Sequence, residues 1–171
     1  MTRLFLLDGT ALAYRAHFAM ARSGLTRPDG RPTGATYGFT MTLRRILEKE
    51  DPDLIAVAFD PPGPTFRHKQ FKDYKATRER MPEDLISQLD DMREIVRAHG
   101  IPIFEKPGFE ADDVIGTLSK QAEARGDEVM LVTGDKDLMQ LVSESVKLYN
   151  VFKPKVELVI EGLVAVEKKF G

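Results

Sequence analysis

Seven acidic residues of this sequence stand at places where a folded chain could bring them together. They are Asp8, Asp60, Glu110, Asp112, Asp113, Asp135 and Asp137. Carboxylates crowded into one site repel one another, and they are tolerated where divalent cations neutralise them. The chemistry that uses such a site is phosphoryl transfer assisted by two metal ions, which activates water and needs no nucleophile from the protein.

The chemical types of the available ligands narrow the choice of metal. The sequence has no cysteine, which excludes thiolate ligands, a cysteine nucleophile and disulfides. Oxygen ligands without a nearby histidine favour Mg²⁺ or Mn²⁺ over Zn²⁺. Each acid taken alone is equally well explained as a polar loop residue, and the cluster from Glu110 to Asp113 also suits a helix N-terminus. Asp90 and Asp91, by contrast, are predicted to be solvated on the outer side of a helix.

A basic and aromatic segment runs from Phe66 to Arg80. Its cations and rings alternate, as binding of single-stranded nucleic acid by phosphate contacts and base stacking requires. The candidate nucleic-acid contacts are Phe66, Arg67, Lys69, Lys72, Tyr74 and Arg80. The other interpretation is a solvated loop whose aromatic residues pack inward. A segment of this kind also suits a mobile lid.

Two further features could belong to the site. Arg15 lies one or two helical turns past Asp8 and could reach a bound phosphate, although a surface position explains it equally well. The polar, turn-rich stretch from Gly24 to Gly34 is predicted to be a mobile loop near the site.

These residues are carried by apolar runs that alternate with helical patterns. Strands are predicted at 4–7, 54–59, 101–104, 129–133 and 146–149, and helices at 36–50, 82–99, 112–125 and 136–142. The first helix is predicted from the spacing of Tyr37, Met41, Leu43 and Leu47, and the second has Leu85, Leu89, Met92 and Val96 as its buried side. In the third, Val114, Ile115, Leu118 and Ala122 are predicted to face inward.

The alternation predicts an α/β fold with a mostly parallel central sheet flanked by helices on both faces. Ligands of such sheets bind beyond the carboxyl ends of the strands. Asp8, Asp60 and Asp135 follow three of these predicted strands, so we expect them to meet at one edge. The helix that begins near Asp112 can bring further acids to it.

Composition and charge fit a single globular domain. The chain has 171 residues, is 42% hydrophobic and 30% charged, and has a formal net charge of −2. Without the seven clustered acids the remainder is positive, so this total is compatible with a phosphate-binding protein. No apolar run is long enough to span a membrane, and the short run after Met1 is not typical of a signal peptide. We expect a cytoplasmic monomer.

Several motifs, in order along the whole chain, resemble the amino-terminal 5′ nuclease domain of bacterial DNA polymerase I, a relative of the flap endonucleases. The motifs are Leu7-Asp8-Gly9, Tyr14-Arg15-Ala16, Pro32-Thr33-Gly34-Ala35, Tyr37-Gly38, Phe59-Asp60, Thr65-Phe66-Arg67, Tyr74-Lys75, Arg78, Met81-Pro82, Glu110-Ala111-Asp112-Asp113-Val114-Ile115 and Thr133-Gly134-Asp135-Lys136-Asp137. The last two are highly specific.

The resemblance implies a PIN-like (resolvase-like) three-layer fold with the basic segment as a mobile arch that clamps the flap. It makes the seven acids ligands of Mg²⁺, with Mn²⁺ able to substitute, and places Arg15, Lys75 and Arg78 at the scissile phosphate. It also implies a 5′-3′ exonuclease or flap endonuclease that removes primers and displaced strands of DNA during replication and repair, with a polymerase region in the full-length chain.

The sequence departs from the pattern at its end. A further motif with two more acids, and the helix-hairpin-helix region that grips duplex DNA, follow in the family but not within residues 1–171. We therefore expect an incomplete second metal site and weak cleavage by this chain alone.

Three other interpretations share part of this pattern. Leu7-Asp8-Gly9-Thr10 resembles the signature of haloacid-dehalogenase-like phosphatases, but Leu6 stands where their nucleophilic aspartate belongs. A non-catalytic DNA-binding module would use the basic segment alone. A PIN-type ribonuclease would share the acids and differ in the sugar it accepts.

Overall fold

The computed structural model describes residues 1–71, 73–74, 80–151 and 159–170. Its centre is a six-stranded sheet in the order β3-β2-β1-β4-β5-β6. The strands are β1 (Arg3–Asp8), β2 (Leu54–Ala58), β3 (Ile103–Phe104), β4 (Glu128–Val132), β5 (Val146–Asn150) and β6 (Val159–Glu161). The first five pair in parallel, and β6 pairs antiparallel to β5.

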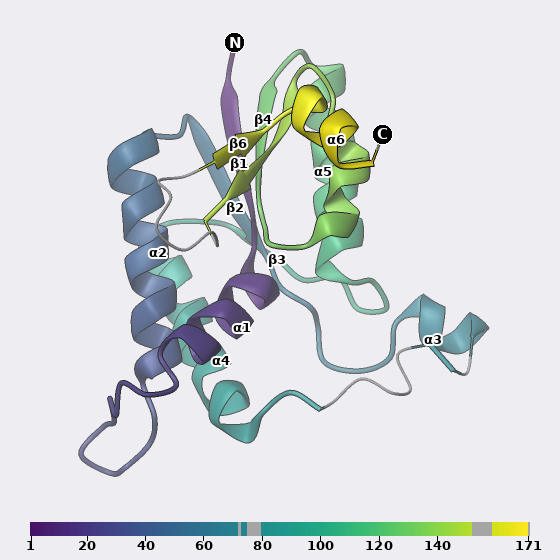
Figure 1. Cartoon of the computed structure of the whole chain (residues 1–171). Coiled ribbons are helices and arrows are strands. Elements are labelled where there is room, and N and C mark those ends of the chain that lie inside the picture. Colours follow the sequence, from purple (N-terminus) through teal and green to yellow (C-terminus); the bar gives the residue numbers. More distant parts are fainter. Residues whose placement is uncertain (72, 75–79, 152–158, 171) are drawn as a thin grey trace.

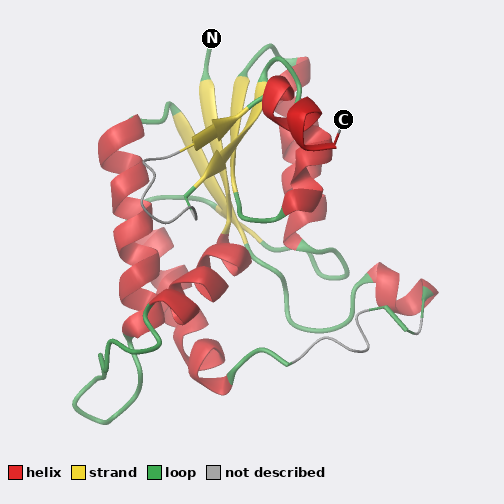
Figure 2. Cartoon of the chain, in the orientation of Figure 1, coloured by secondary structure: helices red, strands yellow, loops and turns green. Residues whose placement is uncertain are grey.

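Helices cover both faces of the sheet, which gives three layers (Figures 1 and 2). On one face lie α1 (Gly9–Ala19), α2 (Gly34–Glu50) and α4 (Glu83–Ala98); on the other lie α5 (Ala111–Ala124), the 3₁₀ helix η1 (Lys136–Leu141) and α6 (Leu163–Phe170). The short α3 (Phe66–Gln70) stands away from the sheet in Figure 1. The predicted α/β architecture is thus confirmed.

Alternation along β1 shows how the sequence builds the two cores. Phe5 and Leu7 pack with α1, α2 and α4, whereas Leu4 and Leu6 pack with α5 and η1. Successive side chains of a strand point to opposite faces, so a strand buried on both faces needs an unbroken apolar run. Such unbroken apolar runs are what made the strands recognisable in the sequence.

The apolar residues from which three helices were predicted are buried to different degrees. In α2 the buried side consists of Ala35, Phe39, Leu43 and Ile46, while Tyr37 and Met41 are 51% and 45% exposed. Small and aromatic residues pack against α1 here, so the large apolar residues did not mark the buried face. In α4 and α5, Leu89, Val114 and Leu118 are partly buried at the core margin, and the other predicted inward residues are buried.

Four elements lie outside the predicted strands and helices, namely α1, α3, β6 and α6. Helix α1 buries Gly9, Leu12, Ala13 and Ala16, and small buried residues give little contrast with its outer face. It begins because Asp8 caps it, accepting a hydrogen bond from the Ala11 N–H at 3.0 Å.

The strand order places the ends of β1 and β4 at a topological switch point. Strand β1 leads to α1 on one face, and β4 leads to η1, which packs on the other. A crevice forms at such a point, beyond the carboxyl ends of the strands. In the described part of the chain, no helix is both long and apolar enough to cross a bilayer.

Replacing Gly9 by alanine tests the close packing under this crevice. The added Cβ would lie 2.7 Å from Cε1 of Phe59 and 2.8 Å from Cγ1 of Val57. We expect Gly9→Ala to destabilise the protein by about 1–3 kcal/mol, measured by denaturant unfolding. Gly116→Ala is the matched control, because its Cβ would have Leu141 at 3.7 Å as its nearest neighbour, and we expect it to be neutral or stabilising. Equal stability of the two variants would contradict this account.

Candidate active site

Five of the seven predicted acids line one cleft of about 400 Å³ at the switch point. They are Asp8, Asp60, Glu110, Asp112 and Asp135, and the other lining residues are Thr10, Ala11, Tyr14, Met81 and Ala111. These acids come from the ends of three parallel strands and from the start of α5. The expectation that acids distant in sequence meet at one sheet edge is thereby confirmed for these five.

Asp8 is the buried acid at the floor of the cleft. Its Oδ1 accepts the Ala11 N–H at 3.0 Å, and its Oδ2 accepts the Thr133 hydroxyl at 3.1 Å. Burial raises the pKa of Asp8 to about 6, and the negative charges of Asp60 and Asp135 add to the rise, while the two hydrogen bonds oppose it. Asp8 is therefore held in place at an electrostatic cost.

Threonines and backbone amides hold the acids of the neighbouring strands. The Thr10 hydroxyl accepts the Asp60 N–H at 2.9 Å, and Oδ1 of Asp60 accepts the Ala111 N–H at 2.7 Å. The latter bond ties the end of β2 to the start of α5. On the other side the Thr133 hydroxyl accepts the Asp135 N–H at 3.0 Å, so one hydroxyl contacts the residues that follow both β1 and β4.

The start of α5 is fixed by a reciprocal capping box. The Glu110 side chain accepts the Asp113 N–H, and Oδ2 of Asp113 accepts the Glu110 N–H at 2.9 Å. Between them, Oδ1 of Asp112 is buried without a hydrogen-bond partner among the described residues. Burial raises the pKa of Asp112, and the charges of Asp113 and Glu110 raise it further. A buried carboxylate oxygen without a donor suits a cation ligand.

The two remaining acids lie outside this cleft. Asp113 pairs with Arg67, whose Nη1 and Nη2 lie 2.8 and 2.6 Å from its two oxygens. Asp137 is exposed and lines an adjoining depression with Arg67 and Asp112. The structure therefore does not bring all seven predicted ligands into one cleft.

The predicted cationic residues are placed only in part. Arg15 is exposed on α1 and does not line the cleft. Lys72, Lys75 and Arg78 lie outside the described residues. The loop from Gly24 to Gly34 contributes nothing to the cleft lining, because α1 carries the chain away from the sheet edge before the loop begins.

The basic segment begins close to the acids. Phe66 packs its ring 5.4 Å from that of Phe109, and the Tyr74 hydroxyl donates to Oε2 of Glu110 at 3.2 Å. Lys69 and Arg80 are exposed, and Phe71 is 66% exposed. The segment thus approaches the cleft through Arg67 and Tyr74, and exposes Lys69 and Arg80.

The donor set of the cleft fits a divalent cation, although no finished ligand shell is present. Among the described residues, no group of three or more acidic or histidine side chains is spaced closely enough to hold an ion as it stands. Backbone amides and a hydroxyl donate to several of the carboxylate oxygens. The lone oxygen of Asp112 and the all-oxygen chemistry agree with Mg²⁺ or Mn²⁺.

Sequence reasoning missed the residues that orient the acids. Thr10 directly follows one motif and Thr133 begins another, but hydroxyl residues are common at strand ends and their partners depend on tertiary structure. Tyr14 and Met81, which line the cleft, belong to the quoted motifs, and their approach to it required the three-dimensional arrangement of α1 and the start of α4.

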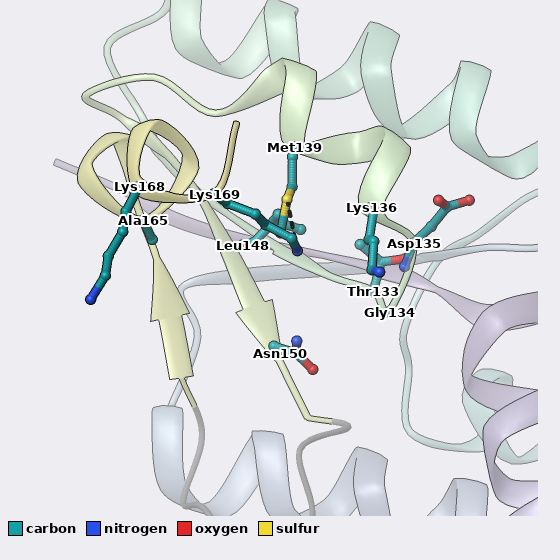
Figure 3. Close-up of a pocket in the computed structure, with 10 residues that line it drawn as sticks. All are labelled: Thr133, Gly134, Asp135, Lys136, Met139, Leu148, Asn150, Ala165, Lys168 and Lys169. Atoms are coloured by element: carbon teal, nitrogen blue, oxygen red, sulfur yellow. Dashed lines mark hydrogen bonds between the residues drawn. The ribbon is translucent and has the colours of Figure 1, made fainter. Parts of the chain in front are cut away.

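A second hollow of about 450 Å³ adjoins the acidic cleft (Figure 3). Asp135 lines both. The cationic residues of the hollow are Lys136 from η1 and Lys168 and Lys169 from α6, and its remaining lining is Thr133, Gly134, Met139, Leu148, Asn150 and Ala165. A cationic hollow and an anionic cleft thus lie on either side of one carboxylate.

The fold and the cleft together define a three-layer α/β protein with an acidic site at the switch point of its sheet. Residues 3–171 match the family described as "5'-3' exonuclease, N-terminal resolvase-like domain". The chain belongs to this family. The sequence had indicated the same family from its motifs.

Curated relatives extend the likeness over nearly the whole chain. DNA polymerase I of Chloroflexus aurantiacus is 44% identical over 169 residues, which is 98% of this chain and 18% of the relative. The thermostable DNA polymerase I of Thermus thermophilus is 47% identical over 148 residues, covering 86% of this chain and 17% of the relative. The chain therefore spans less than a fifth of the length of these relatives.

Solved structures share the fold at low sequence identity. The T5 5'-exonuclease with bound divalent metal ions (zinc) has a TM-score of 0.70 and 22% identity, over 87% of this chain and 55% of that one. A bacteriophage T5 flap endonuclease in a complex with DNA and metal ions gives the same TM-score and identity, with the same coverage. These likenesses establish the PIN-like, resolvase-like fold.

Replacing Asp8 by asparagine tests the electrostatic cost at the cleft floor. The folded chain keeps a proton on Asp8 that the unfolded chain loses, because the pKa rises from 3.8 to about 6. Stability therefore falls as the pH rises through this window, by roughly 3 kcal/mol at most, and the deficit persists above it. In a chelating buffer we expect Asp8→Asn to melt several degrees above the unsubstituted protein at pH 7.5, and at a similar temperature near pH 4.

Asp90→Asn is the matched control, since the Asp90 side chain is 98% exposed. Its melting temperature should follow the unsubstituted protein at both pH values. A melting temperature of Asp8→Asn that is lower at pH 7.5 than at pH 4, relative to that control, would show that Asp8 stabilises the metal-free fold.

Proposed function

We propose that this chain is the amino-terminal nuclease part of a DNA polymerase I, a metal-dependent 5′-3′ exonuclease and flap endonuclease that hydrolyses DNA. The observation that carries the proposal is the cleft at the switch point, where five carboxylates converge and one oxygen of Asp112 lacks a donor among the described residues. Family membership and the likeness to DNA polymerase I sequences support it. The proposed substrate is DNA with a 5′ flap or a single-stranded 5′ end, met by a monomer in the cytoplasm.

Divalent cations are part of the proposal. Metal ions accompany the T5 5'-exonuclease and the T5 flap endonuclease in their structures, and the oxygen-only donors here favour Mg²⁺, with Mn²⁺ able to substitute. Asp8, Asp60, Glu110, Asp112 and Asp135 would hold the ions. When bound, the ions would activate water and neutralise charge at the scissile phosphodiester.

The chain's own residues orient the ligands and receive the substrate. Asp8 is fixed by Ala11 and Thr133, and Asp60 is fixed by Ala111. Pre-oriented ligands need no reorganisation when substrate binds, and this favours catalysis. The exposed Lys69 and Arg80 supply positive charge beside the cleft, where a phosphate backbone would approach.

Cleavage of a 5′-labelled flap DNA tests the proposal. We expect products with Mg²⁺ or Mn²⁺ and none with a chelator. Asp112→Asn should lower the cleavage rate by about a hundredfold or more, because it removes a charged cation ligand. Asp90→Asn, on the exposed side of α4, should cleave normally.

Two outcomes would contradict the proposal, namely cleavage that persists in the chelator and full activity of Asp112→Asn. A parallel assay with an RNA strand of the same sequence distinguishes a ribonuclease, which would cleave the RNA in preference to the DNA.

A further inference from the structure

Arg67 joins the basic segment to the acids at the start of α5. Both of its terminal nitrogens bind Asp113, at 2.8 and 2.6 Å, and Nη1 lies 3.5 Å from Oε2 of Glu110. Its guanidinium carbon lies 4.7 Å from the centre of the Phe66 ring. A planar guanidinium that binds two oxygens of one carboxylate fixes orientation as well as distance.

Other contacts fasten the same part of the chain. The Phe66 N–H donates to the Gly108 carbonyl at 2.7 Å, directly before the start of α5, and Phe66 packs on Phe109. The Tyr74 hydroxyl donates to Glu110. Helix α3 is therefore attached to the first turn of α5 by backbone, aromatic and ionic contacts together.

The neighbouring acids Asp112 and Asp113 differ in the hydrogen bonds that their carboxylate oxygens accept. Both oxygens of Asp113 accept hydrogen bonds, from Arg67 and from the Glu110 N–H. Asp112 lines the cleft and has a buried oxygen with no donor among the described residues. Sequence alone predicted the same role for both, as metal ligands, and predicted Arg67 as a DNA contact.

We propose that Arg67 and Asp113 act as one positioning unit for the metal ligands Glu110 and Asp112. Asp113 is then the anchor of Arg67, and the guanidinium offsets the repulsion within this turn of acids and holds Glu110 at the cleft. The inference rests on the proposed function only in taking the cleft as a cation site. The attachment also means that the first turn of the basic segment is fixed directly to the cleft wall.

The rival roles predict an opposite sign for one substitution. If Asp113 were a metal ligand, removing Arg67 would free it and remove a nearby positive charge, and cation affinity would rise. If the two residues position Glu110 and Asp112, removing either one weakens cation binding, and removing both is no worse than removing one. Supporting residues of metal ligands typically change affinity by about 10–100-fold.

The test is Mn²⁺ affinity, measured by electron paramagnetic resonance of the free ion, for Arg67→Ala, Asp113→Ala and the double variant. We expect each to bind Mn²⁺ at least about tenfold more weakly, with non-additive effects, and Arg67→Lys to fall between. Tighter binding by Arg67→Ala, or additive losses in the double variant, would overturn the proposal. If Arg67→Ala does not fold in a melting assay, Arg67→Lys and Asp113→Asn decide the same question.

Arg93→Ala is the matched control. Arg93 makes a comparable pair with Glu105, at 2.8 and 2.6 Å, and also lies over an aromatic ring, that of Phe59. Its loss should lower the melting temperature and leave Mn²⁺ affinity unchanged. Flap-DNA cleavage adds an independent readout, since a positioning role lowers kcat whereas a DNA contact raises KM. If the variants bind Mn²⁺ as expected here but the unsubstituted protein cleaves no DNA, the result would count against the proposed function and not against the positioning role.

The cationic hollow beside the cleft carries a second, independent inference. Figure 3 shows the Lys169 side chain reaching from α6 toward η1, over Leu148, with Nζ 3.6 Å from Sδ of Met139. Lys136 and Asp135 lie at the other end, toward the acidic cleft. Lys136, Lys169 and Asp135 line a concave space together with Met139 and Leu148, whereas the side chain of Lys168, another lining residue, extends away from them (Figure 3).

We infer that this hollow binds a backbone phosphate of the DNA strand that is cleaved. Phosphate groups recur along a DNA strand. When one phosphate lies over the acids of the cleft, the next phosphate of the same strand can reach the hollow, because the hollow and the cleft share Asp135. Lysine ammonium groups bind phosphate as point charges. The inference rests on the proposed function, because the strand must first enter the cleft.

Salt-dependent DNA binding in Ca²⁺, where binding is read without following cleavage, tests the hollow. We expect Lys169→Gln to bind flap DNA more weakly and to lower the slope of log K against log salt by about one. Lys49→Gln, in the last turn of α2 on the other face of the sheet from α6, should change neither. An unchanged slope would overturn the inference, and so would loss of inorganic phosphate binding without any effect on DNA. Failure of every protein to bind DNA would instead contradict the proposed function.

Discussion

Repulsion among carboxylates at the end of a buried sheet is the constraint on which this site depends. Asp8 is almost fully buried, and burial raises its pKa to about 6. Donors offset the carboxylate charges one by one: Ala11 N–H and the Thr133 hydroxyl at Asp8, Ala111 N–H at Asp60, and the Arg67 guanidinium at Asp113. Apolar residues at these strand ends would give a more stable fold, so the clustered charges indicate a functional role.

Much of the fold followed from the sequence because its strands are buried on both faces. Unbroken apolar runs such as Leu4 to Leu7 leave few other interpretations, and the strand-end acids followed from the rule for parallel sheets. Helix α1 was missed because its buried side is largely alanine and glycine. Helix α2 was predicted partly from Tyr37 and Met41, which are apolar yet exposed, a tolerance that surfaces commonly show.

The site was predictable in its ligand types and not in its supporting contacts. The carboxylates were recognisable from their positions, but the partners of Asp113 and Asp8 lie 46 and 125 residues away in sequence. Such pairs depend on the register of the sheet and on where α3 lies, and neither leaves a local pattern. From the sequence, Arg67 was therefore predicted to contact DNA and Asp113 to bind a metal ion, whereas in the structure the two side chains bind each other.

The hydroxyl of Thr133 joins the residues that end β1 and begin the turn after β4. One small side chain thereby links the carboxylate of Asp8 to the backbone that carries Asp135, beyond the last paired residues of two neighbouring strands. The other side chains around these acids, such as Tyr14 and Met81, come from separate segments of the chain. Exchanges among them would therefore alter the shape of the entrance without moving Asp8 relative to the turn that carries Asp135.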